Sequence, residues 1–556
     1  MEKLKPKLFS VMKGYTKEQF VKDVVAGIIV AIIALPLSIA LALASGVTPE
    51  KGIYTAITAG FVISFLGGSR VQIAGPTAAF ATIVAGIVAK NGMDGLIIAT
   101  LMAGLILMLM GFLRLGSLIK FIPYTITTGF TAGIAVTIFI GQIKDFLGLT
   151  VVSEEPLIET MDKLKAVFEF IGTTNVQALI VGAVCMVILI GWPYLPGICK
   201  RIPPSLIAVF VSIGMVKGFG MQVNTIGDLY EISNKLPVFS FPHVTYATVR
   251  AVLPDAFTIA ILAAIESLLS CVVADSMVNS RHRSNMELIA QGAGNITSAL
   301  FGGIPATGAI ARTAANVKNG GRTPVAGMVH AVTLLLILVV LMPYAALIPM
   351  PAIAAILFMV AYNMSEWRKF YKLCKTAPKS DILVLVLTFI LTVVFDLVVA
   401  IEVGIVLAAI LFMKRMSDVT EVEGWKYVEE EEEDADSISL RQVPENTMVY
   451  EISGPLFFGA ADKILKITLR ENANCLVLRM RSVNAIDATA MHYLEQLYED
   501  CHRKKIWLIL SHVNEQPMKV MTKAGFVEKV GADNFCLHID EALRRAGNLQ
   551  SRPTSG

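Results

Sequence analysis

The chain has 556 residues, of which 55% are hydrophobic and only 16% are charged, and its mean hydropathy is +0.66. A soluble protein of this length carries about 25% charged residues, so the composition excludes an ordinary soluble protein. The net charge of +3 says little by itself, and no nucleic-acid partner is expected. The seven cysteines show neither paired nor metal-ligand spacing, so we expect reduced or membrane-buried thiols, with no metal and no cofactor.

Long apolar runs fill the chain from residue 22 to residue 416. They include "VVAGIIVAIIALPLSIALALASG", "GLIIATLMAGLILMLMGFL", "VTLLLILVVLMPYAAL" and "ILVLVLTFILTVVF". Runs of about 17 to 25 apolar residues are long enough to cross a bilayer as helices. The sequence therefore predicts a polytopic α-helical membrane domain at 22–416, after a cytoplasmic N-terminal segment at 1–21.

Basic clusters indicate the topology of this domain. They fall on alternate loops if about fourteen segments cross the membrane, with both termini in the cytoplasm. Lysines near 144–165 and 217–250, on the opposite side, fit the rule less well. We expect a multi-pass protein of the cell inner (plasma) membrane.

The character of the chain changes after Arg415. Residues 417–445 contain the acidic run "EEEEED" and are predicted to be a linker. Residues 446–548 have the pattern of a soluble α/β domain, and 549–556 form a tail. In that domain "TMVYEIS", "NCLVLRMR" and "KIWLILSH" are predicted strands, "DATAMHYLEQLYEDCHRK" is a predicted helix, and "IDEALRRAG" is a final helix ending at a glycine.

Two segments inside the membrane domain are interrupted. "GPTAAFATIVAGIVAK" offers about fourteen helical residues from Pro76 to Ala89, or about 20 Å, which is too short to span alone. "FGGIPATGAIARTAANVKNGG" offers a helix of about eleven residues from Gly308. Irregular backbone at membrane depth survives only where protein buries it or where it lines a cavity. Two such segments indicate the central site of a transporter.

An offset relates the two segments. Asp23 and Asp255 open similar apolar stretches and are 232 residues apart, and 232 added to Pro76 gives Gly308. The sequence therefore predicts an inverted repeat, with the N-terminal ends of two half-helices facing each other near the bilayer midplane. Such ends present unpaired N–H groups and partial positive charge, which favour an anion.

Polar residues near these ends are candidate site residues. Thr77 and Thr307 add hydroxyl groups, and Arg312 lies one turn into the second half-helix. A charge there is expensive without a partner. Arg312 either contacts the substrate, or it reaches the membrane interface or a backbone carbonyl.

A second buried charge is Glu266, near the middle of its segment. It is either a coupling residue that binds a proton or a cation, or a structural partner for a helix end or for Arg312. Ser270 shares its helix face. Glu402 also lies within a span, and we expect a structural role for it.

The pattern from "DVVAGIIVAIIALPLSIALALASGVTPEKGIYTAI" through "GGSRVQIAGPTAA" to "GGIPATGAIARTAANVKNGGRTPVAG" resembles the SulP (sulfate permease) family of anion transporters, and the terminal domain resembles the STAS domain. The resemblance covers nearly the whole chain. It implies fourteen segments in a 7+7 inverted repeat, in which a core domain carrying the substrate moves against a gate domain, usually in a homodimer.

The resemblance also implies site residues. In the family the anion contacts correspond to Thr77, Ala78, Leu37, Leu41, Gly308, Ala309, Ala311 and Arg312, and a carboxylate corresponds to Glu266. We expect coupling at Glu266, together with Ser270 on the same helix face. Many eukaryotic members have a glutamine at the position of Leu37, and this departure weakens any claim about sulfate. Glu266 replaces the aspartate of sodium-coupled bicarbonate members and Ile310 replaces a hydroxyl residue. Both differences favour proton coupling or exchange.

In the STAS domain, Thr489 occupies the position that is phosphorylated in related antagonist proteins. A phosphate at a helix N-terminus is well placed electrostatically. Thr489 could equally be an ordinary N-cap, as could Asp487. The domain is expected to pack against its dimer mate, to tune transport, or to bind a cytosolic protein.

The function predicted from the sequence is secondary active transport of a small anion such as sulfate, bicarbonate or a dicarboxylate, by proton symport and an elevator-like motion. An anion exchanger, an uncoupled channel and a sodium-coupled bicarbonate symporter remain alternatives. An enzyme is not expected, because no nucleophile–base pair and no phosphate loop are evident. A nucleobase–proton symporter and a membrane-tethered signalling receptor fit the residues less well.

Overall fold

The computed structural model describes residues 4–117, 123–152, 159–195, 202–395, 397–424, 443–470 and 472–550. The described chain divides into two compact units, one ending at Ile405 and the other beginning at Val406. Each unit is described by itself below.

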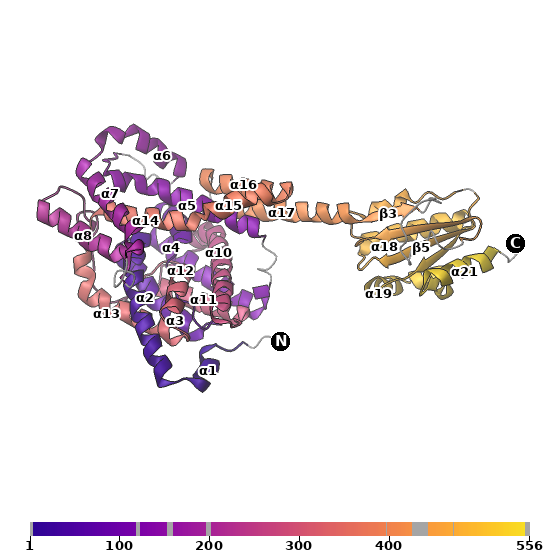
Figure 1. The fold of residues 1–556 in the computed structure, drawn as a ribbon, viewed down its shortest axis with the longest axis horizontal. Coiled ribbons are helices and arrows are strands. Elements are labelled where there is room, and N and C mark those ends of the chain that lie inside the picture. The colour runs from indigo at the N-terminus through magenta and orange to yellow at the C-terminus, as the bar shows by residue number, and fades with distance from the viewer. Residues whose placement is uncertain are drawn as a thin grey trace. The chain divides into compact units, whose positions relative to one another are not determined.

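The first unit is helical (Figure 1). Its first half contains α1 (Leu8–Val11), η1 (Met12–Gly14), α2 (Lys17–Ala44), α3 (Pro49–Leu66), β1 (Ala74–Gly75), η2 (Ala78–Phe80), α4 (Ala81–Phe112), α5 (Tyr124–Leu147), α6 (Thr160–Glu169), η4 (Ile171–Thr173), α7 (Val176–Gly191), η5 (Trp192–Tyr194), α8 (Pro204–Phe219) and α9 (Ile226–Leu229). Its second half contains α10 (Tyr246–Val278), α11 (Ser284–Leu300), β2 (Thr307–Gly308), α12 (Ile310–Lys318), α13 (Val325–Ala345), α14 (Met350–Ser365), α15 (Trp367–Thr376), α16 (Lys379–Val394) and the start of α17 (Leu397–Val419).

These helices pack as two groups. In the first group α4 packs against α10 and α11, and α13 packs against α2 and α3. In the second group α5 packs against α14 and α16, while α7 packs against α8 and α14. The first group contains both interrupted segments, so it is the part of the fold that positions the candidate site.

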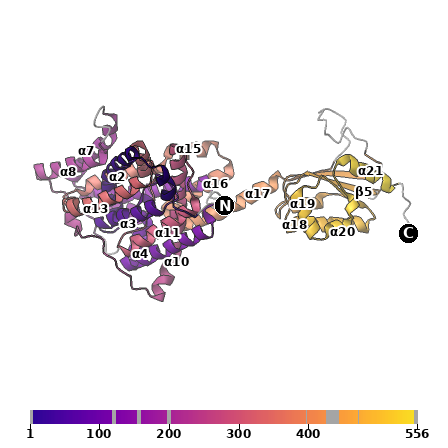
Figure 2. The same cartoon turned by 90° about the horizontal axis from the view of Figure 1, so that it is seen from below.

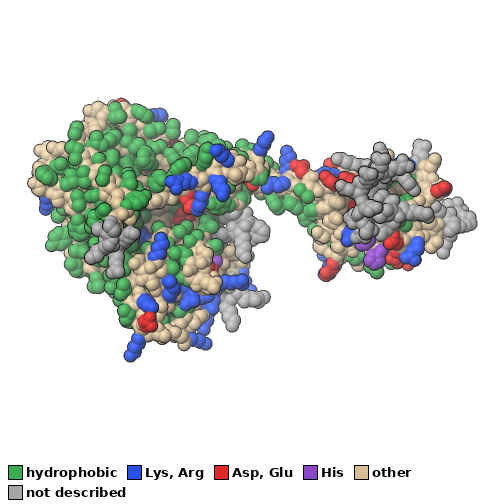
Figure 3. All heavy atoms as spheres, in the orientation of Figure 1, with side chains coloured by type: hydrophobic (Ala, Val, Ile, Leu, Met, Phe, Trp, Pro, Cys, Tyr) green, Lys and Arg blue, Asp and Glu red, His purple; other side chains and the backbone are tan. Residues whose placement is uncertain are grey.

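The surface of the first unit is apolar. Among the described residues, six helices are long and apolar enough, by length and composition, to cross a membrane. Hydrophobic side chains cover much of the visible face (Figure 3). Exposed examples on α4 and α13 are Leu105, Leu109, Val332, Leu336 and Val340. Contiguous apolar surface of this kind requires lipid or protein against it, which confirms the polytopic membrane class. The number of fourteen crossings stays a prediction.

Both interrupted segments are helices that begin later than the sequence predicted. The first begins as a single turn at Ala78, after Thr77 in extended conformation, and α4 follows from Ala81. Its helical geometry breaks at Gly92, whose φ is +67°. The second, α12, has nine residues and begins at Ile310, not at Gly308. In the second segment Gly308 is held in β2 by pairing with Ala74, and in the first segment the extended backbone of β1 continues through Thr77.

Asp23 and Asp255, which open the two similar apolar stretches, lie inside longer helices. α2 begins at Lys17 and α10 at Tyr246, each after a threonine whose side chain caps the helix. Asp23 is fully buried, and its carboxylate accepts hydrogen bonds from the N–H of Arg322 (2.8 Å) and the hydroxyl of Thr323 (2.5 Å). Asp23 therefore ties α2 to the loop before α13, a structural role.

The second unit contains a five-stranded sheet in the order β3-β4-β5-β6-β7, in which β3 is antiparallel and the other strands are parallel. β5 is buried along most of its length, as expected for a strand covered on both faces. Figure 2 shows α21 on the opposite side of the sheet from α18 and α20. The elements are β3 (Glu421–Gly424), β4 (Thr447–Ser453), η8 (Ala461–Lys466), β5 (Cys475–Ser482), α18 (Ala488–Arg503), β6 (Trp507–Ser511), α19 (Glu515–Lys523), α20 (Phe526–Val530), η9 (Ala532–Asn534), β7 (Phe535–Cys536) and α21 (Ile539–Gln550).

The three predicted strands and the helix after Asp487 are present in this unit. The final helix does not end at Gly547 but continues to Gln550. Residues 421–424, in the stretch predicted as a linker, form β3, which pairs with β4. The acidic run at 429–434 lies outside the described residues.

Candidate functional site

The two interrupted segments meet directly before their helices, where β1 pairs with β2. We call this pair of short strands the crossing. β1 pairs antiparallel with β2, with Gly75 opposite Thr307 and Ala74 opposite Gly308. Gly75 and Thr307 are separated by the same 232 residues as the sequence offset. Both strands are buried. Because each strand leads into a helix, two helix N-termini begin on either side of one crossing, and the N–H groups of a first helical turn have no partner within their own helix.

α10 forms one wall of this crossing. The hydroxyl of Thr77 donates a hydrogen bond to the Glu266 carboxylate (3.1 Å), which joins the first half-helix to α10. On the second segment, Gly308 donates its N–H to the Ser267 hydroxyl (3.3 Å), and Ser267 contacts the Thr307 hydroxyl (2.6 Å). Glu266 and Ser267 are adjacent in sequence, so one turn of α10 contacts both segments.

In the hydrogen bonds that hold the second segment against α10, the donor and the acceptor of each bond can be assigned. Thr307 donates its only hydroxyl proton to the Ala263 carbonyl (3.1 Å), so in its contact with Ser267 it must accept. Ser267 in turn accepts from the N–H of Gly308. The order is therefore Gly308 N–H to Ser267, Ser267 to Thr307, and Thr307 to Ala263. Every hydroxyl in it is satisfied, which fixes β2 against α10.

The Arg312 side chain lies between β1 and α2. Its side chain is only 3% exposed, and Nη2 donates to the Ser38 hydroxyl on α2 (3.3 Å). A Cβ on Gly75 would lie 2.4 Å from Nη1, so the glycine leaves room for the guanidinium beside β1. Nη1 has no hydrogen-bond partner within the described parts of the chain. A buried cation with an unpaired donor is well suited to an anion. Among the described residues, Glu266 is hydrogen-bonded to Thr77 and Arg312 to Ser38, and no ion pair joins Arg312 to Glu266.

The predicted site residues occupy different environments. Thr77, Glu266, Gly308 and Arg312 lie at the crossing through the contacts above. Ser270 is buried, and its hydroxyl has no partner among the described residues; Ser267, one turn earlier, makes the contacts to β2. The remaining predicted contacts are apolar: Ala78 and Leu41 are buried, Leu37 and Ala309 are half-buried, and Ala311 is exposed.

Sequence reasoning missed three polar residues of this site. Ser267 directly follows Glu266, Ser38 lies next to Leu37, and Gln72 lies two residues before β1. Each is a small or neutral polar residue in an apolar segment. The role of such a residue can be inferred only when its partner segment is known. The partners of Gln72 lie 195 or more residues away in the sequence, and the partner of Ser38 lies 274 residues away.

A cavity of about 580 Å³ lies next to this site. It is lined by the end of α2, by the first turns of α4, by α5 and by α6. On the first half-helix, the residue of the cavity lining that is nearest in sequence to Thr77 is Ala81, four residues later. The residues of β1 and β2 do not line the cavity. The cavity is therefore adjacent to the candidate site, and we place the site by its polar geometry.

In the second unit, Asp487 is the N-cap of α18. Its carboxylate accepts hydrogen bonds from the N–H groups of Ala490 (2.9 Å) and Phe458 (2.8 Å). Thr489 is the second residue of the helix and is half-buried. The capping role left open between these two residues belongs to Asp487.

The fold and site define a class: a polytopic membrane transporter that carries a C-terminal α/β domain. Residues 20–388 match the Sulfate permease family, and residues 438–542 match the STAS domain. The chain belongs to the sulfate permease family, whose members are anion transporters and not enzymes.

Relatives and solved structures agree with this assignment. The chain is 40% identical to a putative sulfate transporter, YvdB, of Bacillus subtilis over 95% of this chain and 98% of the relative. It is 30% identical to the bicarbonate transporter BicA of Picosynechococcus sp. over 94% of both. The transmembrane domain of a cyanobacterial BicA superposes with a TM-score of 0.62 at 27% identity, covering 71% of this chain and 98% of that one. The murine anion transporter Slc26a9, in an inward-facing state, shares the fold with a TM-score of 0.86 at 19% identity, covering 98% and 94%.

Proposed function

We propose that this protein is a secondary active transporter that moves a small anion together with a proton across the plasma membrane, with both termini in the cytoplasm. The observation that carries the proposal is the buried guanidinium of Arg312 beside the crossing of two half-helices, with Nη1 unpaired within the described chain.

The anion binds between the two half-helix N-termini. Backbone N–H groups of the first turns donate to it, and the helix dipoles favour its charge. Arg312 supplies the formal positive charge. Ala78, Ala309 and Ala311 have side chains small enough for the anion to approach the backbone. Leu37 and Leu41 supply an apolar wall, which limits the site to a small ligand.

Proton coupling follows from the bond between Thr77 and Glu266. An ionised carboxylate only accepts, so it holds the Thr77 hydroxyl proton. When Glu266 is protonated, its O–H can donate to Thr77, which frees the Thr77 proton to point at the anion. Proton binding thereby adds one donor to the anion site and removes a nearby negative charge. Both effects raise anion affinity, which is the condition for symport.

Transport proceeds by an elevator-like displacement of the first helix group, which carries the site, against the second. The packing of α2–α4 with α10–α13, and of α5–α8 with α14 and α16, supports such a division into core and gate. We further propose a homodimer and a STAS domain that tunes transport, by phosphorylation of Thr489 or by binding a cytosolic protein.

The test is uptake of labelled sulfate, bicarbonate and fumarate into proteoliposomes, with and without an inward proton gradient. Saturable uptake of one anion that the gradient accelerates is the expected result and names the substrate. Uptake that ignores the gradient but rises with anions trapped inside would make the protein an exchanger. Uptake without saturation would make it a channel.

Sulfate and bicarbonate are both candidate substrates, because a putative sulfate transporter is 40% identical over 95% of this chain and a bicarbonate transporter is 30% identical over 94% of both chains. A sodium gradient is therefore imposed in a parallel arm of the same assay. Acceleration of bicarbonate uptake by sodium, with no effect of protons, would replace the proton-coupled proposal by sodium symport.

A further inference from the structure

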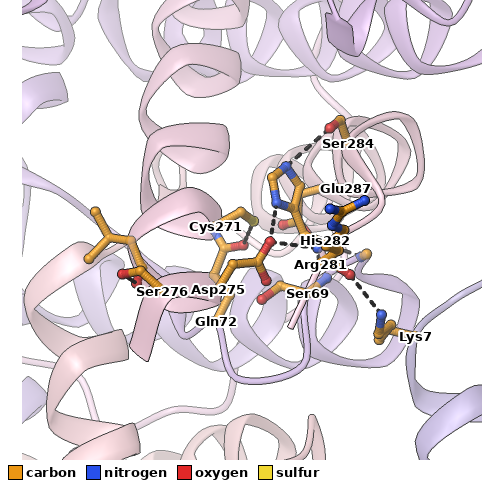
Figure 4. Close-up of polar contacts among 12 residues, drawn as sticks. Lys7, Ser69, Gln72, Cys271, Asp275, Ser276, Arg281, His282, Ser284 and Glu287 are labelled. Carbon is orange, nitrogen blue, oxygen red and sulfur yellow. Dashed lines mark hydrogen bonds and ion pairs between the residues drawn. The ribbon is translucent and has the colours of Figure 1, made fainter. Parts of the chain in front are cut away.

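Gln72 joins three elements of the candidate site. It lies two residues before β1, and its side chain is only 5% exposed. Its Nε2 donates to the Ser267 carbonyl on α10 (3.2 Å), and its Oε1 accepts from the Cys271 thiol. Figure 4 shows Gln72 beside Cys271 near the end of α10. Ser267 and Cys271 are four residues apart, so the amide spans one helical turn of α10.

The same amide occupies the place of a side chain at position 308. A Cβ on Gly308 would lie 1.4 Å from Nε2 of Gln72 and 2.5 Å from its Cδ. Gly308 is not among the described glycines with positive φ, so its backbone conformation does not require glycine. The reason for glycine at 308 is therefore space, and Gln72 fills that space.

Ser267 links this amide to the rest of the site. Its carbonyl accepts from Gln72, while its hydroxyl accepts from the N–H of Gly308 and contacts Thr307. The preceding residue, Glu266, accepts from Thr77. A shift of Gln72 would move β1 and β2 relative to α10, and with them the starts of both half-helices.

We propose that Gln72 is a positioning residue of the anion site, matched in size to Gly308, and that this pair sets the spacing between the two half-helix N-termini. The inference deepens the proposed anion transport and rests on it. Because the spacing decides how closely donors converge on an anion, Gln72 affects affinity and the discrimination between planar bicarbonate and tetrahedral sulfate.

The size match is tested by a double-mutant cycle. Gly308→Ala places a methyl group on the Gln72 amide, so transport falls strongly and the melting temperature of the purified protein falls with it. Gln72→Ala removes the amide and leaves a cavity. In the double variant the methyl group introduced at position 308 occupies that cavity, so both transport and melting temperature recover above those of Gly308→Ala alone. Losses that simply add in the double variant would overturn the proposal.

The positioning role is tested by Gln72→Met, which keeps the volume and removes both hydrogen bonds. We expect the apparent KM for the transported anion to rise about threefold to tenfold, the loss of one or two ordinary hydrogen bonds. We also expect a change in the anion ratio, which is the ratio of the sulfate and bicarbonate concentrations that inhibit this uptake by half. Gln291→Met is the matched control, because Gln291 is a buried glutamine of the same helix group that bonds to Glu287 on its own helix. Its KM should equal that of the wild type, even if its melting temperature falls.

An unchanged KM and an unchanged anion ratio in Gln72→Met would show that Gln72 only stabilises the fold, and would overturn the proposal. Failure of the wild-type protein to transport any of the anions would instead overturn the proposed function. The melting-temperature arm of the double-mutant cycle does not depend on transport, so it still decides whether Gln72 and Gly308 are a matched pair.

Discussion

Two glycines at the crossing shape the candidate site because neither carries a Cβ atom. Gly75 leaves room for the Arg312 guanidinium, and Gly308 leaves room for the Gln72 amide. Both are places where a polar side chain from another segment lies against extended backbone. The polar atoms therefore reach the crossing only because two backbone positions carry no side chain.

Arg312 should be required for anion affinity. Arg312→Ala is expected to raise the apparent KM by about tenfold to a hundredfold, the effect of losing a charge-assisted hydrogen bond, while Arg312→Lys retains part of the affinity. Gly75→Ala should act in the same direction, because its methyl group would lie 2.4 Å from Nη1 and displace the guanidinium. Concentration-dependent uptake measures both.

Gly86→Ala is the matched control, because a Cβ on this glycine of α4 meets no atom within 4 Å. It should leave KM unchanged. Unaltered affinity in Arg312→Ala would assign Arg312 a purely structural role.

Glu266 should carry the proton coupling. Glu266→Gln keeps the shape of the side chain but cannot change its charge, so uptake should lose its dependence on the proton gradient while anion exchange persists. Gradient-driven uptake and anion exchange, measured on the same proteoliposomes, check this prediction. A Glu266→Gln protein that still responds to the gradient would place the coupling proton elsewhere.

At the scale of elements, the N-terminal segment is bound to the end of the first helix group. The Arg283 guanidinium donates to the carbonyl of Lys5 (2.6 Å) and to the hydroxyl of Ser10 (3.0 Å), and Lys7 Nζ donates to the Arg281 carbonyl (2.7 Å). The backbone N–H of Lys7 also bonds to the Gly67 carbonyl (2.8 Å). Figure 4 shows that His282, in the loop between α10 and α11, contacts Asp275 of α10 and Ser284 of α11. The segment thus joins the loop before β1 to the loop between α10 and α11.

Loss of this connection should destabilise the first unit. Arg283→Ala removes every hydrogen bond that the Arg283 guanidinium donates to the N-terminal segment. The melting temperature should therefore fall by a few degrees. Arg281→Ala is the control, because Arg281 contacts Lys7 through its backbone carbonyl, which the substitution keeps. Equal melting temperatures for the two variants, measured in detergent, would contradict a stabilising role for the segment.

The cap of α18 offers a test within the STAS unit. Asp487→Ala should lower its stability by about 1 kcal/mol, because two backbone N–H groups lose their acceptor. Thr489→Ala should have a smaller effect, since Thr489 follows the cap. Denaturant unfolding of the STAS unit measures both; the reverse order would make Thr489 the residue that holds the helix start.

At the scale of the whole molecule, apolar runs and offsets predicted the membrane class, the two interrupted segments and the strands of the STAS sheet. They could not predict where the half-helices begin, because the pairing of β1 with β2 depends on residues 232 apart. The roles of Gln72, Ser267 and Ser38 were hidden for the same reason. β3 was missed because "EVEG" is short and acidic, and only its partner β4 makes it a strand.

β3 makes the boundary of the STAS unit testable. A fragment beginning at Val443 leaves one edge of β4 uncovered, whereas a fragment beginning at Met416 keeps β3 on that edge and the bonds from Lys463 to the Ser417 and Thr420 carbonyls. Uncovered strand edges lose hydrogen bonds and promote association. The longer fragment, ending like the shorter one at Gln550, should therefore melt at a higher temperature and stay monomeric at higher concentration. Calorimetry and size-exclusion chromatography of the two fragments measure this, and equal melting temperatures would place the boundary after β3.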